Sequence, residues 1–170
     1  MIAASDFKQG MRRLASGVSI VTSLDKGGAY CGLVATSVSA VSADPTPSLL
    51  VCVNRSASSH DAIRDAGIFC VSILGDAARG VAERFSAPHL RASRFEPLGA
   101  FRWTPLVTGA PALEGALASF DCAVAHAFTV NSHTVFVGTV KHLRLWHDSL
   151  SPLVYLDGRY AALADAGAAG

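Results

Sequence analysis

The sequence Gly32-Leu-Val-Ala-Thr-Ser-Val-Ser-Ala-Val-Ser-Ala-Asp44 is followed, past two prolines, by Leu49-Leu-Val-Cys-Val-Asn54. Branched apolar side chains recur in both stretches, a pattern that predicts β-strands. On a strand, Ser37 and Ser39 project from one face and Thr36 from the other. Small side chains let a flat ligand approach the backbone, and hydroxyl groups can orient it. We therefore expect a strand-built site for a planar ligand with polar edges.

The next segment, Arg55-Ser-Ala-Ser-Ser-His60, is rich in hydroxyl groups. Ser58 followed by Asp61 is typical of a helix N-terminus, so we expect a short helix over 58–65 that is closed by Gly67. Unpaired N–H groups and the positive end of the helix dipole suit a phosphate near Ser58 and Ser59. Arg55 can add positive charge. The expected planar ligand therefore carries a phosphate.

Length and composition indicate one globular domain over residues 1–170, with a frayed tail over about 161–170. The chain has 51% hydrophobic residues and a mean hydropathy of +0.37, which is high for a monomer, so we expect a homodimer. The net charge is only +1 and basic residues form no dense run, which argues against nucleic-acid binding. No apolar run is long enough to span a membrane, so we expect a cytoplasmic protein.

The four cysteines are far apart and lack the paired spacing of zinc ligands. We expect neither a metal site nor a disulfide framework, and we interpret the cysteines as small buried apolar residues. This interpretation applies less to Cys52, because Cys52 lies beside the expected ligand site.

Alternation of apolar and polar residues predicts a mainly β fold with few, short helices. An antiparallel barrel, closed or nearly closed, suits this pattern. The expected strands are 18–24, a long partner strand over 29–41, a central strand over 48–54 covered on both faces, 68–74, 116–130, 134–145 and 152–156.

Two helices and one irregular segment complete the expected organisation. Phe7, Met11 and Leu14 fall on one face of a helix that Ser5 can cap, and we expect this helix to lie on the sheet. A second helix begins at Asp76 and runs to about Phe85. Residues 86–112 show little periodicity, so we expect a long irregular loop, which is typical of a binding loop or lid.

Six ordered motifs resemble the short-chain flavin reductase family, and together they extend over almost the whole chain. They are Phe7-Lys-Gln-Gly-Met-Arg-Arg-Leu-Ala-Ser-Gly-Val-Ser-Ile-Val-Thr22, Gly32 to Ser39, Pro47-Ser-Leu-Leu-Val-Cys-Val-Asn54, Phe69-Cys-Val-Ser-Ile-Leu74, Leu113-Glu-Gly-Ala-Leu-Ala-Ser-Phe-Asp-Cys122 and Pro152-Leu-Val-Tyr155 with Gly158-Arg-Tyr160.

The resemblance implies a homodimeric, antiparallel split β-barrel that binds FMN or FAD and oxidises NADH or NADPH to reduce the flavin. Members often supply reduced flavin to a partner monooxygenase. The flavin contacts that the resemblance implies are Thr36, Ser37 and Ser39 for the ring and ribityl chain, Cys52, Val53 and Asn54 for the ring edge, Ser58 and Ser59 for the phosphate, and Phe85 at the border of the pocket.

Nicotinamide binding is associated in this family with a Gly-Asp-His motif before a long strand. This chain has Asn131-Ser132-His133 there, so only His133 is kept. The departure bears on NADH affinity and on the choice between NADH and NADPH, not on the fold. His126 lies on an expected apolar strand face, which is typical of a core histidine.

Two other functions remain open at the level of sequence. One is an FMN-containing reductase of another acceptor, such as a corrinoid or a ferric complex. The other is a split barrel that binds flavin or haem without turnover, which the altered Asn-Ser-His turn keeps open. No single side chain is expected to act as an indispensable proton donor, because hydride transfer depends mainly on the positioning of two stacked rings.

Overall fold

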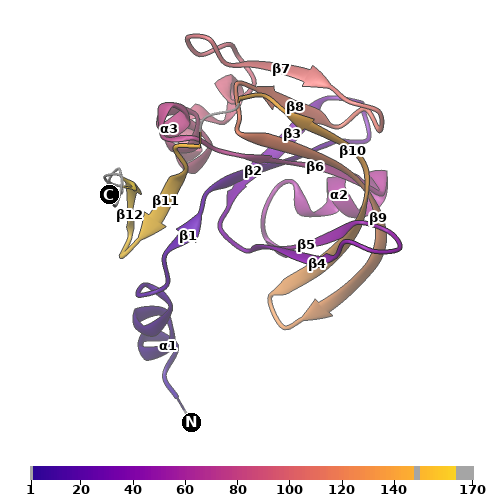
Figure 1. Ribbon diagram of the computed structural model, residues 1–170. Coiled ribbons are helices and arrows are strands. Elements are labelled where there is room, and N and C mark those ends of the chain that lie inside the picture. Colours follow the sequence, from indigo (N-terminus) through magenta and orange to yellow (C-terminus); the bar gives the residue numbers. More distant parts are fainter. Residues whose placement is uncertain (1, 148–149, 164–170) are drawn as a thin grey trace.

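The computed structural model describes residues 2–147 and 150–163 and is mainly β, with a few short helices (Figure 1). Its largest element is a seven-stranded sheet in which every neighbouring pair is antiparallel. The mainly β class with short helices is thus confirmed. In spatial order the strands are β3 (Tyr30–Ala35), β2 (Ser19–Leu24), β6 (Ile68–Ile73), β9 (Ala118–Val130), β10 (His133–Leu145), β5 (Ser48–Asn54) and β4 (Val38–Ser42).

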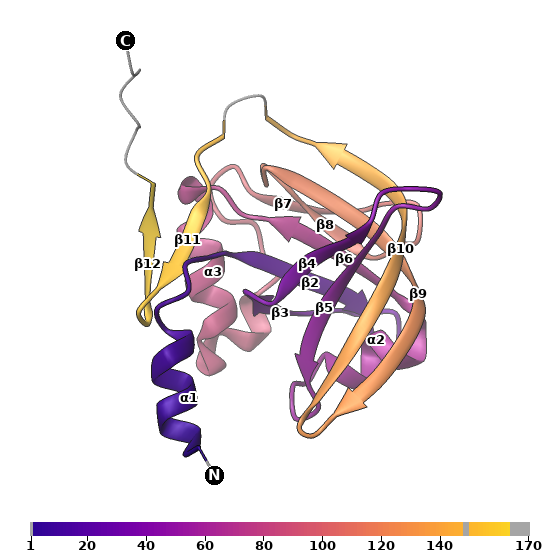
Figure 2. The same cartoon turned by 60° about the horizontal axis from the view of Figure 1, so that its bottom comes forward.

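The two edge strands of this sheet, β3 and β4, are consecutive in the sequence and are joined by Thr36 and Ser37 alone. In a flat sheet the edges of seven strands lie roughly 29 Å apart, but this connection reaches at most about 11 Å. The sheet therefore curls until its edges approach each other at Thr36 and Ser37, and Figure 2 shows the curvature. Among the described residues, β3 and β4 share no ladder.

The expectation of one continuous strand over 29–41 is therefore wrong. Residues 30–35 pair with β2, whereas residues 38–42 pair with β5 on the opposite edge of the sheet. Alternating side chains are compatible with either arrangement, because the pattern does not show where a strand changes its partner.

Apolar side chains fill the concave side of the curled sheet. Val51 and Val53 of β5 point inward and pack with Phe69 and Phe136. Helix α2 (His60–Ala66) adds Ile63 to the same cluster. The helix ends at Gly67, whose φ of 67° lies in the left-handed region that favours glycine. The short helix predicted over 58–65, with Gly67 as its end, is confirmed to within two residues.

A second apolar cluster lies under helix α3 (Arg79–Ser86), which follows the short helix η1 (Asp76–Ala78). Phe85 is buried there beside Val18 and Leu74. The helix predicted from Asp76 to about Phe85 is confirmed as this pair of short helices.

The segment 86–112, expected to be irregular, contains ordered structure. It begins with the short helix η2 (Pro88–Ser93) and then forms a hairpin of β7 (Arg102–Pro105) and β8, which extends to Glu114 (Pro111–Glu114). The buried Asp121 accepts hydrogen bonds from Thr108 N–H at 2.7 Å and from its hydroxyl at 2.5 Å. These contacts tie the hairpin turn to β9, and a long-range carboxylate contact leaves no local signal in the sequence.

A three-stranded sheet completes the fold, formed by β1 (Ser16–Gly17), β11 (Leu153–Leu156) and β12 (Arg159–Ala162). The frayed tail was predicted to start at about 161, but Ala161 and Ala162 pair with β11. The rest of the predicted tail, 164–170, lies outside the described residues.

Helix α1 (Ala4–Met11) stands apart from the seven-stranded sheet in both views (Figures 1 and 2). Phe7 is 64% exposed and Met11 is 49% exposed. The expected packing of this helix on the sheet is therefore wrong. Ser5 lies inside the helix, and Ala3 occupies the N-cap position without a side-chain hydrogen bond.

The end of β9 is also more exposed than its alternating pattern predicts. Its pairing with β6 stops at Ala123, so the strand runs on with β10 as its partner. His126 lies in this extension and is exposed, which contradicts the interpretation of His126 as a core histidine.

Substituting alanine for glycine should have opposite effects on stability at Gly138 and at Gly10. A Cβ atom there would lie 2.4 Å from the Phe69 ring and 2.8 Å from Cys122 Cβ. We expect Gly138→Ala to lower the free energy of unfolding by about 1–3 kcal/mol through overpacking. Gly10, within α1, has nothing near its Cβ position. Gly10→Ala should stabilise by about 0.5–1 kcal/mol. Urea denaturation measures the free energy of unfolding of both variants. An unchanged free energy of unfolding in Gly138→Ala would contradict the close packing of Phe69 and Cys122 against Gly138.

Candidate functional site

Strands β4, β5 and β10 lie side by side and carry several of the expected site residues on one face. Ser37 accepts a backbone hydrogen bond from Cys52 N–H at 3.2 Å, and Asn54 is paired with His133. Paired residues of neighbouring strands share a face, and alternate residues along a strand do too. We call this side, which points away from the core, the outward face. Its residues are Ser37, Ser39, Leu50, Cys52, Asn54, His133, Val135 and Val137.

The corner between β3 and β4 forms one border of the outward face. Thr36 and Ser37 are exposed, and the Ser37 hydroxyl donates a hydrogen bond to Cys52 O at 3.1 Å. Thr36 separates two clefts of about 210 and 340 Å³, both of which are also lined by Tyr155. Because β4 is an edge strand, part of its backbone is open to a ligand.

A tight turn follows β5 at the same end of the β4–β5 pair, because Ser37 lies beside Cys52, two residues before Asn54. The Asn54 Oδ1 atom accepts hydrogen bonds from Ser56 N–H and from the Ser56 hydroxyl, each at 2.9 Å. Ser58 is exposed at the end of this turn. Ser59 is 1% exposed, and no group in the described part of the chain hydrogen bonds to its Oγ atom. A buried hydroxyl without a partner is costly, so an additional polar group is expected beside Ser59.

Two of the expected residues face the core instead. The Val53 side chain is fully buried, so only its backbone is available to a ligand. Phe85 is 2% exposed and packs against Phe95 and Trp103. The structure thus does not place Phe85 at the border of a cleft. Its neighbour Ser86 lines the 210 Å³ cleft with Thr36.

Sequence reasoning missed three residues of that cleft, namely Ser86, Tyr155 and Tyr160. The Ser86 and Tyr160 hydroxyl groups lie 2.9 Å apart, and the two tyrosine rings meet edge to face with centroids 5.5 Å apart. Both tyrosines belong to a motif quoted above, but their role becomes visible only when β11 and β12 fold back beside α3.

Positive charge lies beside the end of the outward face where Ser37 and Asn54 are found. Lys8 and Arg12 of the N-terminal segment line the 340 Å³ cleft, and Arg55 is exposed directly after Asn54. None of the ion pairs among residues 2–147 and 150–163 involves these three side chains. They are suited to an anionic ligand.

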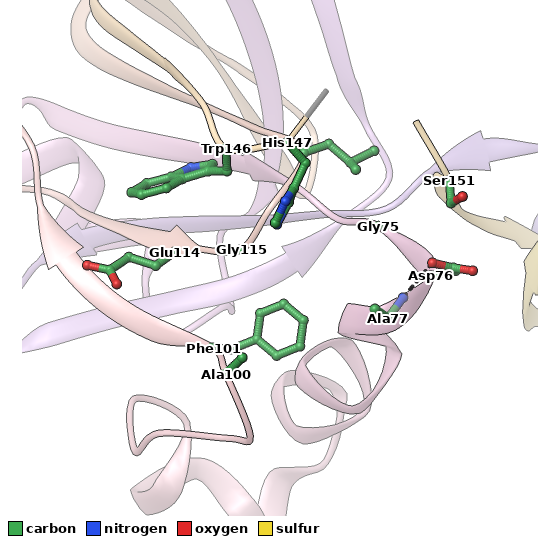
Figure 3. Close-up of a pocket in the computed structure, with 11 residues that line it drawn as sticks. Gly75, Asp76, Ala77, Ala100, Phe101, Glu114, Gly115, Trp146, His147 and Ser151 are labelled. Carbon is green, nitrogen blue, oxygen red and sulfur yellow. Dashed lines mark hydrogen bonds between the residues drawn. The ribbon is translucent and has the colours of Figure 1, made fainter. Parts of the chain in front are cut away.

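A cavity of about 640 Å³, larger than either of these clefts, lies elsewhere (Figure 3). Figure 3 shows Phe101 and His147 pointing toward one another across it, with Trp146 at one side. No residue of the outward face lines this cavity. The expected site therefore does not coincide with this larger cavity. A further hollow of about 390 Å³ is mostly apolar and has Ser39 at its border.

Three of the four cysteines, Cys31, Cys70 and Cys122, are poorly suited to nucleophilic chemistry or metal binding. Burial raises the pKa of Cys31 to about 11 and that of Cys122 to about 12, and it also raises the pKa of Cys70. Protonated thiols are weak nucleophiles and weak metal ligands. Within the described ranges, no cluster of three or more potential ligands could hold a metal ion.

Comparison with known proteins connects this geometry to a family. The family model described as "Flavin reductase like domain" matches residues 11–164. The FMN reductase (NADH) RutF of Stutzerimonas stutzeri is 37% identical over 163 residues, which cover 96% of this chain and 90% of that protein. None of the helices in the described residues is long and apolar enough to cross a membrane.

Solved structures give the same result. BorF, the flavin reductase component of a bacterial two-component tryptophan halogenase, is 32% identical with a TM-score of 0.84, covering 96% of this chain and 99% of that one. The styrene monooxygenase flavin reductase from Pseudomonas putida S12 is 27% identical with a TM-score of 0.79, covering 94% and 97%.

The raised pKa of Cys31 predicts a steep pH dependence of alkylation. Because burial favours the neutral thiol, the thiolate fraction should rise about tenfold per pH unit between pH 8 and 10 and level off only near the pKa of about 11. Iodoacetamide labelling followed by mass spectrometry checks this in a Cys52→Ser variant, which lacks the other half-buried thiol. A rate that is already constant above pH 9 would contradict the burial of Cys31.

Proposed function

The chain belongs to the flavin reductase-like family, and we propose that it is an NAD(P)H-dependent flavin reductase whose flavin lies on the outward face. The observation that carries this proposal is the alignment of Cys52 and Asn54 of β5 with Ser37, which directly precedes β4, along one face. They offer hydroxyl, backbone and amide groups along one open surface.

The polar groups present fit a flavin nucleotide. Thr36, Ser37 and Ser39 can meet the ring and the ribityl chain, and the backbone at 52–54 can meet the ring edge. Ser58 lies where the phosphate is expected, and the buried Ser59 Oγ atom lacks a partner that a phosphate oxygen can provide. Arg55 supplies positive charge beside it. Val53 contributes only its backbone, and the buried Phe85 side chain has no assigned contact with the flavin.

When bound, the flavin accepts a hydride from the nicotinamide of NADH or NADPH. The contribution of the protein to this step would be to hold the two rings in contact and aligned, which would be the task of the residues assigned to the two subsites. Because the Cys52 N–H already donates to Ser37 O, the Asn54 N–H is the backbone donor that we assign to the negative charge developing at the ring edge. We assign the nicotinamide to the His133 side, because His133 is exposed and paired with Asn54.

The product, reduced flavin, is proposed to serve a separate oxygenase. Two structural relatives support this role: one is the reductase component of a tryptophan halogenase and the other is the flavin reductase of styrene monooxygenase. FMN is the expected flavin, since the relative from Stutzerimonas stutzeri is named an FMN reductase. NADH is the expected reductant, because the name of the same relative specifies NADH. We also propose that the enzyme acts in the cytoplasm.

The curled sheet is proposed to be a split barrel that dimerises through its outward face. Beyond the polar border, this face carries Val135 and Val137 and continues onto β9 with Phe128 and Val130, which are 53% and 52% exposed. A continuous apolar surface of this kind is typical of an interface. A second copy of the chain would cover it and enclose the flavin ring.

Steady-state oxidation of NADH tests the proposed activity. The purified protein should oxidise NADH under air at a rate that rises and saturates with added FMN. Turnover that requires a corrinoid or ferric acceptor, with FMN retained through purification, would indicate the second kind of reductase. Flavin or haem binding without oxidation of NADH or NADPH would identify a binding protein and contradict the proposal.

Ser37 and Asn54 should affect flavin binding more than hydride transfer. We expect Ser37→Ala and Asn54→Ala to raise the Kd for FMN roughly 3- to 10-fold, the effect of one lost hydrogen bond. Flavin fluorescence titration measures Kd, and single-turnover kinetics at saturating FMN measures the hydride step. Ser42→Ala is the control, because Ser42 lies at the far end of β4. A slower hydride step with an unchanged Kd for FMN would contradict the assignment of Ser37 and Asn54 to flavin binding.

Phe128 should be part of the dimer contact. A glutamate there would be desolvated in the interface, so Phe128→Glu should shift the protein from dimer to monomer in sedimentation velocity. Val107→Glu is the matched control, since Val107 is 73% exposed and lies in the β7–β8 turn. A dimer that persists in Phe128→Glu but dissociates in Val107→Glu would place the interface elsewhere.

A further inference from the structure

Two hydrogen bonds fasten the turn after β5 to the start of β10. At the beginning of the turn, Arg55 N–H donates to Ser132 O at 2.9 Å. At its end, His60 Nε2 lies 2.8 Å from Thr134 Oγ1. Both partners belong to the three residues 132–134. The turn and the start of β10 are thus connected by contacts at both ends of the turn.

The second contact is buried. His60 is 5% exposed and Thr134 is 6% exposed. His60 Nδ1 lies 2.9 Å from Asp61 Oδ1, and this hydrogen bond holds the pKa of the Asp61 carboxyl below its ordinary value. Because the ionised carboxylate only accepts, Nδ1 carries the proton, and in the neutral ring Nε2 accepts from the Thr134 hydroxyl. The pair therefore has a defined donor and acceptor.

The contact between His60 and Thr134 affects the position of His133, because Thr134 and His133 are neighbours on β10. Thr134 points inward toward His60, so the residue before it must point outward. His133 is exposed, and its backbone pairs with Asn54, the residue at which the turn begins. Loss of the His60 contact would leave the end of the turn unfastened from β10, so that only the bond from Arg55 N–H to Ser132 O and the pairing of Asn54 with His133 would hold the two together.

We propose that His60 and Thr134 are positioning residues that couple the flavin-phosphate turn to the nicotinamide residue His133. Neither side chain touches a cofactor; each acts through the backbone that it holds. Ordering of the turn by flavin would then also order His133, so that binding of one cofactor favours binding of the other. This inference rests on the proposed function, because that function assigns the two subsites.

Thr134→Val tests the coupling, since it removes the hydroxyl and keeps the shape. We expect the Kd for FMN and the KM for NADH at saturating FMN each to rise roughly 3- to 10-fold, with kcat changed less than twofold. Thr134→Ser keeps the hydroxyl and should restore both constants. Lys26→Ala is the control, because the Lys26 side chain is 84% exposed and pairs with Asp65 of helix α2, outside the contact between His60 and Asp61.

A role limited to stability gives a different result. If Thr134→Val lowers Tm but leaves the Kd for FMN and the KM for NADH at their original values, the proposal is overturned. His60→Gln is the second variant should Thr134→Val fold poorly, and it is expected to raise the same two constants. A wild-type protein that binds FMN but oxidises neither nicotinamide would contradict the proposed function. The FMN titration of Thr134→Val would still decide whether the pair positions the turn.

Discussion

The short connection between β3 and β4 constrains the whole molecule. Thr36 and Ser37 must join opposite edges of a seven-stranded sheet, and the sheet can meet this requirement only by curling. Curling creates the concave side that Val51, Phe69 and Phe136 fill, and the close approach of Phe69 to β10 requires Gly138. The same curvature leaves the outer side of β4, β5 and β10 open.

The proposed site follows from that geometry together with the strand register. Ser37 directly precedes β4 and Cys52 and Asn54 belong to β5, yet pairing and alternation bring them to one face with His133. The buried, unpartnered Ser59 hydroxyl and the exposed Arg55 lie in the turn that continues β5. The larger cavity around Phe101 and His147 lacks this combination of open backbone, hydroxyl groups and positive charge.

The sequence predicted local features better than the choice of strand partners. Local apolar patterns located β2, β5 and β6, and Gly67 located the end of α2, because both signals arise within a few residues. The expectation that β5 is covered on both faces is wrong, since its outer face is only half-buried at Leu50 and Cys52 and exposed at Asn54. The change of partner at Thr36 depends on the opposite edge of the sheet, so no local pattern revealed it. Tyr155 and Tyr160 join the site only through the packing of β11 and β12, and the ordered hairpin within 86–112 depends on distant contacts to Asp121. Phe85 was assigned to the site by resemblance, but its side chain belongs to the core.

Hydrogen–deuterium exchange with and without FMN tests most directly whether flavin binds the outward face. The account predicts slower exchange at 36–39 and 52–59 when FMN is added. The segments around Phe101 and His147, which line the larger cavity, should exchange at the same rate in both states. Protection confined to those segments, with 36–39 and 52–59 unaffected, would contradict the account and move the flavin site to the larger cavity.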